Sequence, residues 1–387
     1  MEKNIFGGKF GLERETLRID KNGRLAQTLH PFDDENLSRD FCENQLEIIT
    51  PVCNSIVEVM TALENLDSKA RSVLDKQGET LWLYSNPPHI DNEKEIPIAK
   101  YCGIMSAKHD YRIKLARRYG KRMMLYSGIH FNFSFSEDYL KSLHKDKSQT
   151  YEDFKNESYF RLLKQVSRYS WLIVLLTSAS PMYDLSFNKD GTDGTVFSGF
   201  SSMRNGHRGY WNQFIPQLDY TDLLAYIRSI KDYIEKGVLF SAGELYLPVR
   251  LKPRGENSLE ALLIGGADHI ELRMFDLNPL EKLGVAQKDL EFAHLFLIYL
   301  LHLEDFDFTS ELQAKAIEHH QSAALYDISN VMINDIPITE TANNFLDKME
   351  DFFSDTPETQ NVIAYQRNKL NNQRICEKIK ARSEVYV

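Results

Sequence analysis

Strict alternation of apolar and polar side chains is the feature of this sequence that most restricts its fold. In residues 128–135, isoleucine and phenylalanine alternate with His130, Asn132 and Ser134. Because successive side chains of a strand point to opposite faces, this pattern predicts a strand with one apolar and one polar face. Strands of this kind are typical of antiparallel sheets that are packed on one face only.

Two other strand-like segments place ionisable groups on one face. The same period of two puts Glu13 with Glu15 in one segment and Glu271 with Arg273 in another. If the three strands are neighbours, their polar faces form a concave acidic floor, where carboxylates repel one another unless cations neutralise them. Mg²⁺ or Mn²⁺ suits such oxygen ligands combined with one imidazole. The competing interpretation is the solvated side of a half-exposed sheet whose charges form ordinary salt bridges.

Asp40 and Glu47 add two more acids, but their odd separation puts them on opposite faces of a regular strand. A bulge or a turn must therefore intervene if both reach one metal; the alternative is a solvated Asp40 at the entrance of a strand. Arg112 and Arg204 suit a bidentate grip on a carboxylate or phosphate. For either arginine alone, solvation at the surface is the competing interpretation.

The rest of the pattern predicts helices around these strands. Apolar residues recur at helical spacing in residues 55–74, about 159–177 and about 289–302. We expect a long surface loop between residues 184 and 212, and a basic, exposed helix after residue 360. Strand-like and helix-like stretches alternate irregularly, and neither a fixed repeat nor a low-complexity linker divides the chain. We therefore expect an α+β fold in one domain.

Composition and absent motifs exclude several classes of function. The formal net charge of −10 argues against general nucleic-acid binding. The longest apolar runs are far shorter than the roughly 20 residues that cross a bilayer, and the first residues do not resemble a signal peptide, so we expect a cytoplasmic protein without membrane attachment. Neither a P-loop nor a Rossmann glycine motif is present, so any ATP must be held by metals and scattered arginines. The four cysteines fit no zinc or disulfide pattern and are expected to be reduced, mostly structural thiols.

Seven blocks, in this order, resemble the bacterial glutamate-cysteine ligase family, including the ligase half of bifunctional glutathione synthases. They cover the chain from about residue 10 to about residue 285. The blocks are FGLERETLRI, KNGRLAQTLHP, RDFCENQLEIITPV, RYGKRMMLYSGIHFNFSF, SSMRNGHRGY, GELYLPVRLK and GGADHIELRMFDLNP.

The resemblance implies a glutamine synthetase-like fold, in which an antiparallel sheet is curved into a funnel with helices packed outside. We expect residues 1–387 to form a single catalytic domain with a shortened helical region at about 286–387. The implied activity is ligation of the γ-carboxylate of glutamate to the amine of L-cysteine. This reaction uses ATP, proceeds through γ-glutamyl phosphate and begins glutathione biosynthesis. No ATP-grasp domain follows, so the glutathione-forming step is expected elsewhere.

The resemblance also implies roles for individual residues. Those that look like Mg²⁺ ligands are Glu13, Glu15, Asp40, Glu47, His130 and Glu271. Arg204 looks like the clamp for the α-carboxylate of glutamate, and the wall around the acceptor amino acid is expected to comprise Phe41, Tyr111, Arg112, Leu115 and Tyr210. Asn132 and Arg273 look like partners of the ATP phosphates, with Arg273 and Glu271 as the catalytic pair.

Met124 departs from the family pattern, because it stands where the family usually carries a glutamine that lines the acceptor pocket. A thioether thus replaces a hydrogen-bonding amide. Met124 therefore leaves open a γ-glutamyl ligase for a different amine. A catalytically inert relative is the third hypothesis.

Overall fold

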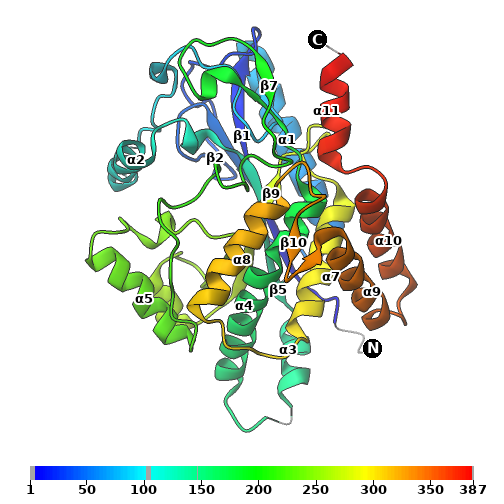
Figure 1. Cartoon of the computed structure of the whole chain (residues 1–387). Coiled ribbons are helices and arrows are strands. Elements are labelled where there is room, and N and C mark those ends of the chain that lie inside the picture. The colour runs from blue at the N-terminus through cyan, green and yellow to red at the C-terminus, as the bar shows by residue number, and fades with distance from the viewer. Residues whose placement is uncertain (1–4, 102–105, 146, 386–387) are drawn as a thin grey trace.

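The computed structural model describes residues 5–101, 106–145 and 147–385, and its fold is α+β (Figure 1). In these residues the main sheet has seven strands, all paired antiparallel. Their order is β2-β3-β1-β5-β9-β8, and β4 pairs with the end of β1. The strands are β1 (Gly8–Asp20), β2 (Leu37–Arg39), β3 (Gln45–Ile49), β4 (Glu79–Trp82), β5 (Gly128–Phe135), β8 (Val249–Lys252) and β9 (His269–Asp276).

Helices and two small hairpins complete the described chain. The hairpins pair β6 (Met182–Asp184) with β7 (Thr195–Phe197) and β10 (Met332–Ile333) with β11 (Ile336–Pro337). The helices are α1 (Ile56–Leu74), α2 (Ser106–Tyr119), α3 (Glu137–His144), α4 (Tyr151–Thr177), α5 (Leu223–Glu235), α6 (Leu259–Gly265), α7 (Gln287–Leu301), α8 (Ser310–Ala323), α9 (Ile338–Phe352), α10 (Pro357–Asn371) and α11 (Ile375–Val385). Among the described residues, none of these helices is both long and apolar enough to traverse a bilayer.

Local signals account for where the helices begin. The hydroxyl of Ser55 accepts a hydrogen bond from the backbone N–H of Glu58 at 3.2 Å. The Glu58 carboxylate in turn accepts one from the backbone N–H of Asn54 at 2.9 Å. This reciprocal capping fixes the start of α1 and confirms the helix predicted at residues 55–74.

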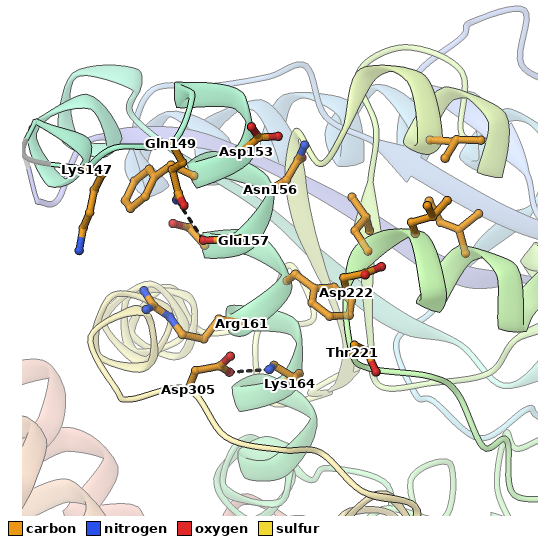
Figure 2. Close-up of a pocket in the computed structure, with 17 residues that line it drawn as sticks. Lys147, Gln149, Asp153, Asn156, Glu157, Arg161, Lys164, Thr221, Asp222 and Asp305 are labelled. Atoms are coloured by element: carbon orange, nitrogen blue, oxygen red, sulfur yellow. Dashed lines mark hydrogen bonds and ion pairs between the residues drawn. The ribbon is translucent and has the colours of Figure 1, made fainter.

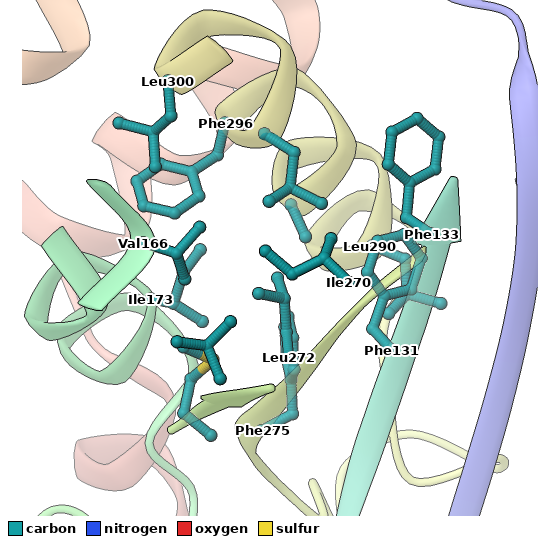
Figure 3. Close-up of a cluster of buried hydrophobic side chains, with 14 of the residues drawn as sticks. Phe131, Phe133, Val166, Ile173, Ile270, Leu272, Phe275, Leu290, Phe296 and Leu300 are labelled. Carbon is teal, nitrogen blue, oxygen red and sulfur yellow. The ribbon is translucent and has the colours of Figure 1, made fainter. Parts of the chain in front are cut away.

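The core lies between the apolar face of the sheet and helices α4 and α7 (Figure 3). Phe131 and Phe133 of β5 and Leu272 of β9 are fully buried there, against side chains such as Ile173 of α4 and Phe296 of α7. Each such side chain stabilises the fold by about 1.5–3 kcal/mol when buried. The predicted apolar face of residues 128–135 is thus confirmed, as are the helices predicted at 159–177 and 289–302. Because this face is filled, substrates have access only to the opposite, polar face.

Two elements differ from the sequence prediction. The segment after residue 360 is not an exposed helix, because α10 buries Val362, Ile363 and Leu370 while packing against α7 and α9. The lysines of this segment suggested exposure, but Lys369 is itself buried. Its ammonium lies 2.5 Å from a carboxylate oxygen of Asp289. The predicted surface loop is also only half correct, because residues 201–205 are buried.

Cys42, Cys53 and Cys376 are free and buried, which confirms the prediction for these three thiols. Burial raises the pKa of Cys376 to about 11 and that of Cys42 further still, so both are protonated at neutral pH. Cys102 lies outside the described residues.

Candidate active site

The register of the sheet brings the predicted polar residues together. β1 lies at the centre, with β3 on one side and β5 on the other. Glu13 pairs with His130 of β5, and Glu15 pairs with Glu47 of β3. On the far side of β5, Asn132 pairs with Glu271 of β9. The three alternating segments are therefore neighbours, as the acidic-floor interpretation requires.

The imidazole of His130 lies at the centre of this group. Its Nδ1 is 3.1 Å from Glu13 Oε2 and 3.7 Å from Glu271 Oε1, and its Nε2 is 3.4 Å from Glu15 Oε1. One ligand atom each from Glu13, His130 and Glu271 lie within 4.8 Å of one another. Asn132 donates a hydrogen bond from Nδ2 to Glu13 Oε1 at 3.1 Å. Five of the predicted residues thus converge on one small region of the floor.

Asp40 and Glu47 both lie near this group, because the chain turns between them as the sequence analysis expected. Asp40 directly follows β2, and residues 40–44 lead back into β3. Loss of hydration raises the pKa of Asp40 to about 6, and the nearby Glu15 carboxylate adds to the shift. The pKa of Glu47 is raised well above its usual value, first by burial and then by repulsion from Asp40, Glu13 and Glu15. The floor therefore carries more negative charge than its own cations balance.

The opposite edge of the floor is cationic. Arg273 Nη1 lies 3.2 Å from Glu271 Oε2, and Lys252 Nζ lies 3.1 Å from Glu271 Oε1. Although burial opposes ionisation, Arg273, Lys252 and His130 hold the pKa of Glu271 well below its usual value. Burial likewise opposes ionisation of Glu13, but the hydrogen bond with His130 keeps its pKa low. Glu271 and Glu13 are thus carboxylates at neutral pH.

Lys252 was missed by the sequence reasoning. The available signal was the alternation in the short strand VRLK, where Val249 and Leu251 are buried and Arg250 and Lys252 project to the polar side. Its four residues are too few to fix a register without knowing the strand that pairs with it.

Arg204 lies across β5 and β9 close to this floor. Its guanidinium donates hydrogen bonds to the backbone oxygens of Arg273 at 2.5 Å and Phe275 at 3.5 Å. It lies so close over Gly128 that a Cβ there would be 2.5 Å from the guanidinium carbon. The absence of a side chain at Gly128 therefore makes room for Arg204. Asn205 holds the same loop to β9, because its Nδ2 donates to Met274 O at 2.9 Å.

The predicted acceptor wall is a second group of residues beside the floor. Phe41, Leu115 and Met124 are buried in one hydrophobic cluster, and Tyr111 and Tyr210 pack against it. We call this set the acceptor cluster. The ring of Tyr210 also lies 4.2 Å from the ring of Tyr246. The sequence reasoning did not single out Tyr246, which lies in an irregular segment just before β8 and so belongs to no periodic pattern.

The guanidinium of Arg112 is held by backbone oxygens. Its Nε donates to Asp40 O at 2.5 Å, and its guanidinium lies 4.8 Å from the centre of the Tyr101 ring. In this arrangement Arg112 fixes the turn that carries Asp40. A direct contact between Arg112 and substrate stays a prediction.

The family model for glutamate-cysteine ligase matches residues 1–241 and 233–323 of this sequence. The chain belongs to the glutamate-cysteine ligase family. The family resemblance inferred from the seven sequence blocks is thereby confirmed. A bifunctional glutathione biosynthesis protein of Listeria monocytogenes is 39% identical over 373 residues, covering 91% of this chain and 48% of that protein. The glutamate–cysteine ligase of Clostridium acetobutylicum is 28% identical over 456 residues, covering 98% of this chain and 93% of the ligase.

The chain spans about half the length of the bifunctional relatives that it matches. Solved structures of glutamate-cysteine ligase relatives share its fold. A bifunctional glutathione synthetase from Pasteurella multocida superposes with a TM-score of 0.86 and 24% identity, covering 98% of this chain and 50% of that one. The glutamate–cysteine ligase of Francisella tularensis, solved with AMP, gives a TM-score of 0.87 at 24% identity, covering 98% and 85%.

Proposed function

We propose that this chain ligates the γ-carboxylate of glutamate to the amine of L-cysteine at the expense of ATP, as the first step of glutathione biosynthesis. The observation that carries the proposal is the convergence of Glu13, His130 and Glu271 with the neighbouring carboxylates of Glu15, Asp40 and Glu47. Family membership supports the same reaction.

The donor set fits Mg²⁺ or Mn²⁺. It consists of five carboxylates and one imidazole, and it contains no thiolate. Burial, and then repulsion from neighbouring carboxylates, raises the pKa of Asp40 and Glu47, as expected where counter-charges belong. Bound divalent cations would offset the repulsion between nucleotide phosphate and substrate carboxylate and polarise the phosphoryl group. The residues proposed to hold them are Glu13, Glu15, Asp40, Glu47, His130 and Glu271.

Arg273 and Asn132 are proposed to bind the phosphates of ATP. Arg273 is fixed by its ion pair with Glu271, so its remaining N–H groups keep a defined direction towards the floor. The charge of Arg273 stabilises the negative charge that spreads over the transferring phosphoryl group. Asn132 is fixed by its hydrogen bond to Glu13, and its buried Oδ1 has no partner among the described residues.

The proposed reaction has two steps. An oxygen of the glutamate γ-carboxylate attacks the γ-phosphorus, so that the bond to ADP breaks and γ-glutamyl phosphate forms. The amine of cysteine attacks the acyl carbon, phosphate leaves, and the nitrogen loses a proton as the amide forms. Arg204 has five N–H donors, of which two contact backbone oxygens, so the others can grip the α-carboxylate of glutamate.

The acceptor cluster sets which amine is used. Phe41, Leu115 and Met124 share one hydrophobic cluster against which Tyr111 and Tyr210 pack, so this wall is mainly apolar and suited to exclude water from the acyl phosphate. A thioether in place of an amide weakens hydrogen-bonded selection of the acceptor. This observation keeps a γ-glutamyl ligase for a different amine as the second candidate.

An amine panel tests both candidates. Glutamate-dependent ADP release is measured with L-cysteine, L-2-aminobutyrate, L-serine, glycine and no amine, each with and without Mg²⁺. The proposal expects Mg²⁺-dependent release with a clear preference for cysteine. Turnover without that preference supports the second candidate, and no glutamate-dependent turnover with any amine supports a catalytically inert relative.

We further propose that residues 1–387 act as one catalytic domain in the cytoplasm, with a helical region at about 286–387. One hydrophobic core running from Ile5 to Leu370 supports this proposal. The curvature of the main sheet into a funnel like that of glutamine synthetase is part of the same proposal.

A further inference from the structure

A second cavity, away from the acidic floor, has the opposite charge. It encloses about 230 Å³ between α4, α8, α9 and the β10–β11 hairpin. Arg168, Lys315 and Lys348 line it together with His319, and no carboxylate does so among the described residues. This is unusual for a chain of net charge −10, in which acids outnumber Lys and Arg by 56 to 46.

The three cations of this cavity have no charged partner. In the described part of the chain, Arg168, Lys315 and Lys348 make no ion pair with a carboxylate. The guanidinium of Arg168 instead lies 4.9 Å from the centre of the Phe306 ring. Unpaired cations that share one cavity repel one another, and an anion between them would remove that repulsion.

The pKa of His319 indicates the sign of the electrostatic potential inside the cavity. Its side chain is 8% exposed, and burial is the first cause that lowers its pKa. The charges of Lys315 and Arg168 lower that pKa further, and only Glu318 opposes them. The interior of the cavity is therefore positive.

A larger cavity differs from the cationic one in its charge (Figure 2). It encloses about 690 Å³ between the first half of α4, α5 and α6, and both acidic and basic side chains line it. Lys164 Nζ lies 2.5 Å from Asp305 Oδ1, and Arg161 donates to the backbone oxygen of Leu301 at 2.9 Å. Because Asp153, Glu157, Asp222 and Asp305 line this cavity together with its cations, it has no excess of positive charge that would favour an anion.

Apolar groups at the mouth of the cationic cavity narrow the class of ligand. Leu312 and Ile336 line it and are 38% and 40% exposed, and Met332 on the same hairpin is 50% exposed. Apolar side chains left in water next to cations suit a ligand with both an anionic group and an apolar part. The volume is below the roughly 300–1,000 Å³ of sites for drug-sized molecules, so the ligand is small.

We propose that this cavity binds a small organic anion, whose phosphate or carboxylate group contacts Arg168, Lys315 and Lys348 and whose apolar part lies against Leu312 and Ile336. Arginine recognises both kinds of anionic group in a bidentate manner. The proposal is independent of the ligase activity.

Methyl NMR of the full chain, labelled at the methionine methyl groups, tests the proposal. Met332 reports on the mouth of the cavity, and Met124 reports on the acceptor cluster, so binding at the two places is distinguished. Phenyl phosphate, benzoate and inorganic phosphate are titrated separately. We expect the Met332 signal to shift saturably with phenyl phosphate or benzoate, and to do so at lower concentration than with inorganic phosphate.

The site variant Lys315→Ala/Lys348→Ala removes two exposed cations and should weaken the binding of the organic anion at least about tenfold. Lys21→Ala/Lys76→Ala makes the same change of net charge at two exposed lysines elsewhere and should leave the binding unchanged. The proposal is overturned if neither organic anion shifts Met332 saturably, or if the site variant binds as tightly as the unmodified chain. Inorganic phosphate binding as tightly as phenyl phosphate would remove the role assigned to Leu312 and Ile336.

Discussion

Glu271 combines complete burial with two cationic partners. Its carboxylate lies between Arg273 at 3.2 Å and Lys252 at 3.1 Å, and one of its oxygens also faces His130 at 3.7 Å. A buried carboxylate persists only where cations stabilise it, so the arrangement keeps a permanent negative charge on the floor. On the proposed mechanism this charge is one of those that hold the divalent cations.

Replacing Glu271 by glutamine should abolish the activity while keeping the shape of the side chain. Glu271→Gln removes a ligand charge and leaves Arg273 and Lys252 without their shared partner. Mutation of a residue that only hydrogen-bonds to a metal ligand typically lowers metal affinity or activity about 10–100-fold. Because Glu271 is itself a proposed ligand, we expect the rate of ADP release to fall at least about 100-fold. Far-UV circular dichroism should stay unchanged.

The control for this variant is Glu260→Gln, which makes the same chemical change at an exposed carboxylate on α6. Its ADP release should equal that of the unmodified chain. Near-normal ADP release by Glu271→Gln would show that Glu271 does not hold a catalytic cation.

At the scale of residues, the alternating patterns sufficed to put Glu13 with Glu15 on one face of their strand, and His130 and Glu271 each on the polar face of its own strand. That these faces join in one floor follows from the strand pairing, which no single pattern encodes. Lys252 could not be found in this way, because its place beside Glu271 depends on which strand pairs with β9. The roles of all these residues in binding and catalysis stay predictions.

Among the elements, the loop that carries Arg204 depends on the one residue in β5 without a side chain. A methyl group at position 128 would meet the end of a flexible side chain, so Gly128→Ala should displace the Arg204 guanidinium without unfolding the sheet. We expect KM for glutamate to rise about tenfold, with a smaller change in kcat, because binding of the α-carboxylate is what is lost. Steady-state kinetics with varied glutamate measures this.

Gly11→Ala is the matched control on the neighbouring strand. Its added methyl group would lie 3.7 Å from Asn132 Cβ, which is an ordinary contact. Equal values of KM for glutamate in the two variants would contradict the assignment of Arg204 as the α-carboxylate clamp.

The loop that carries Arg204 shows why the burial of this segment could not be predicted from the sequence. Residues rich in Ser, Asn and Gly favour exposed turns, yet residues 201–205 are buried because they satisfy Asp276. One oxygen of the Asp276 carboxylate accepts a hydrogen bond from Ser202 at 2.9 Å, and the other accepts one from Ser180 at 2.7 Å. This network joins segments that are distant in the sequence, and no local pattern encodes it.

For the whole molecule, the attachment of α7 to the sheet should respond to pH. His294 of α7 packs against Phe10 and Phe133, with ring centres 4.9 and 4.7 Å apart. Burial lowers the pKa of His294 to about 3, below the value of about 6.5 expected in the unfolded chain. The unfolded state therefore binds the proton first, and stability falls as the pH drops from about 6.5 towards 3.

His294→Leu should remove this part of the acid sensitivity. Between pH 8 and pH 5 the unmodified chain should lose roughly 2 kcal/mol of unfolding free energy through His294, and the variant should lose that much less. Urea unfolding at the two pH values measures the difference. His207→Leu, at an exposed histidine, should keep the full loss. Equal losses in the unmodified chain and His294→Leu would contradict the assignment.

The fold class and the main helices of the molecule were readable from periodicity, because a large core needs long apolar stripes. A helix after residue 360 was predicted as well, but its burial was not, since α10 reaches the core through a mixed surface in which Lys369 is neutralised by Asp289. A buried lysine looks like a solvated one until its partner is known.

The central claim is that side chains from four strands and one turn together hold divalent cations against ATP. Electron paramagnetic resonance of Mn²⁺, titrated into the full chain with a non-hydrolysable ATP analogue, measures this directly. The account predicts at least two Mn²⁺ ions bound per chain, with fewer bound in Glu13→Gln and in Glu271→Gln. Binding no greater than that of the analogue alone, or unchanged binding in both variants, would contradict it.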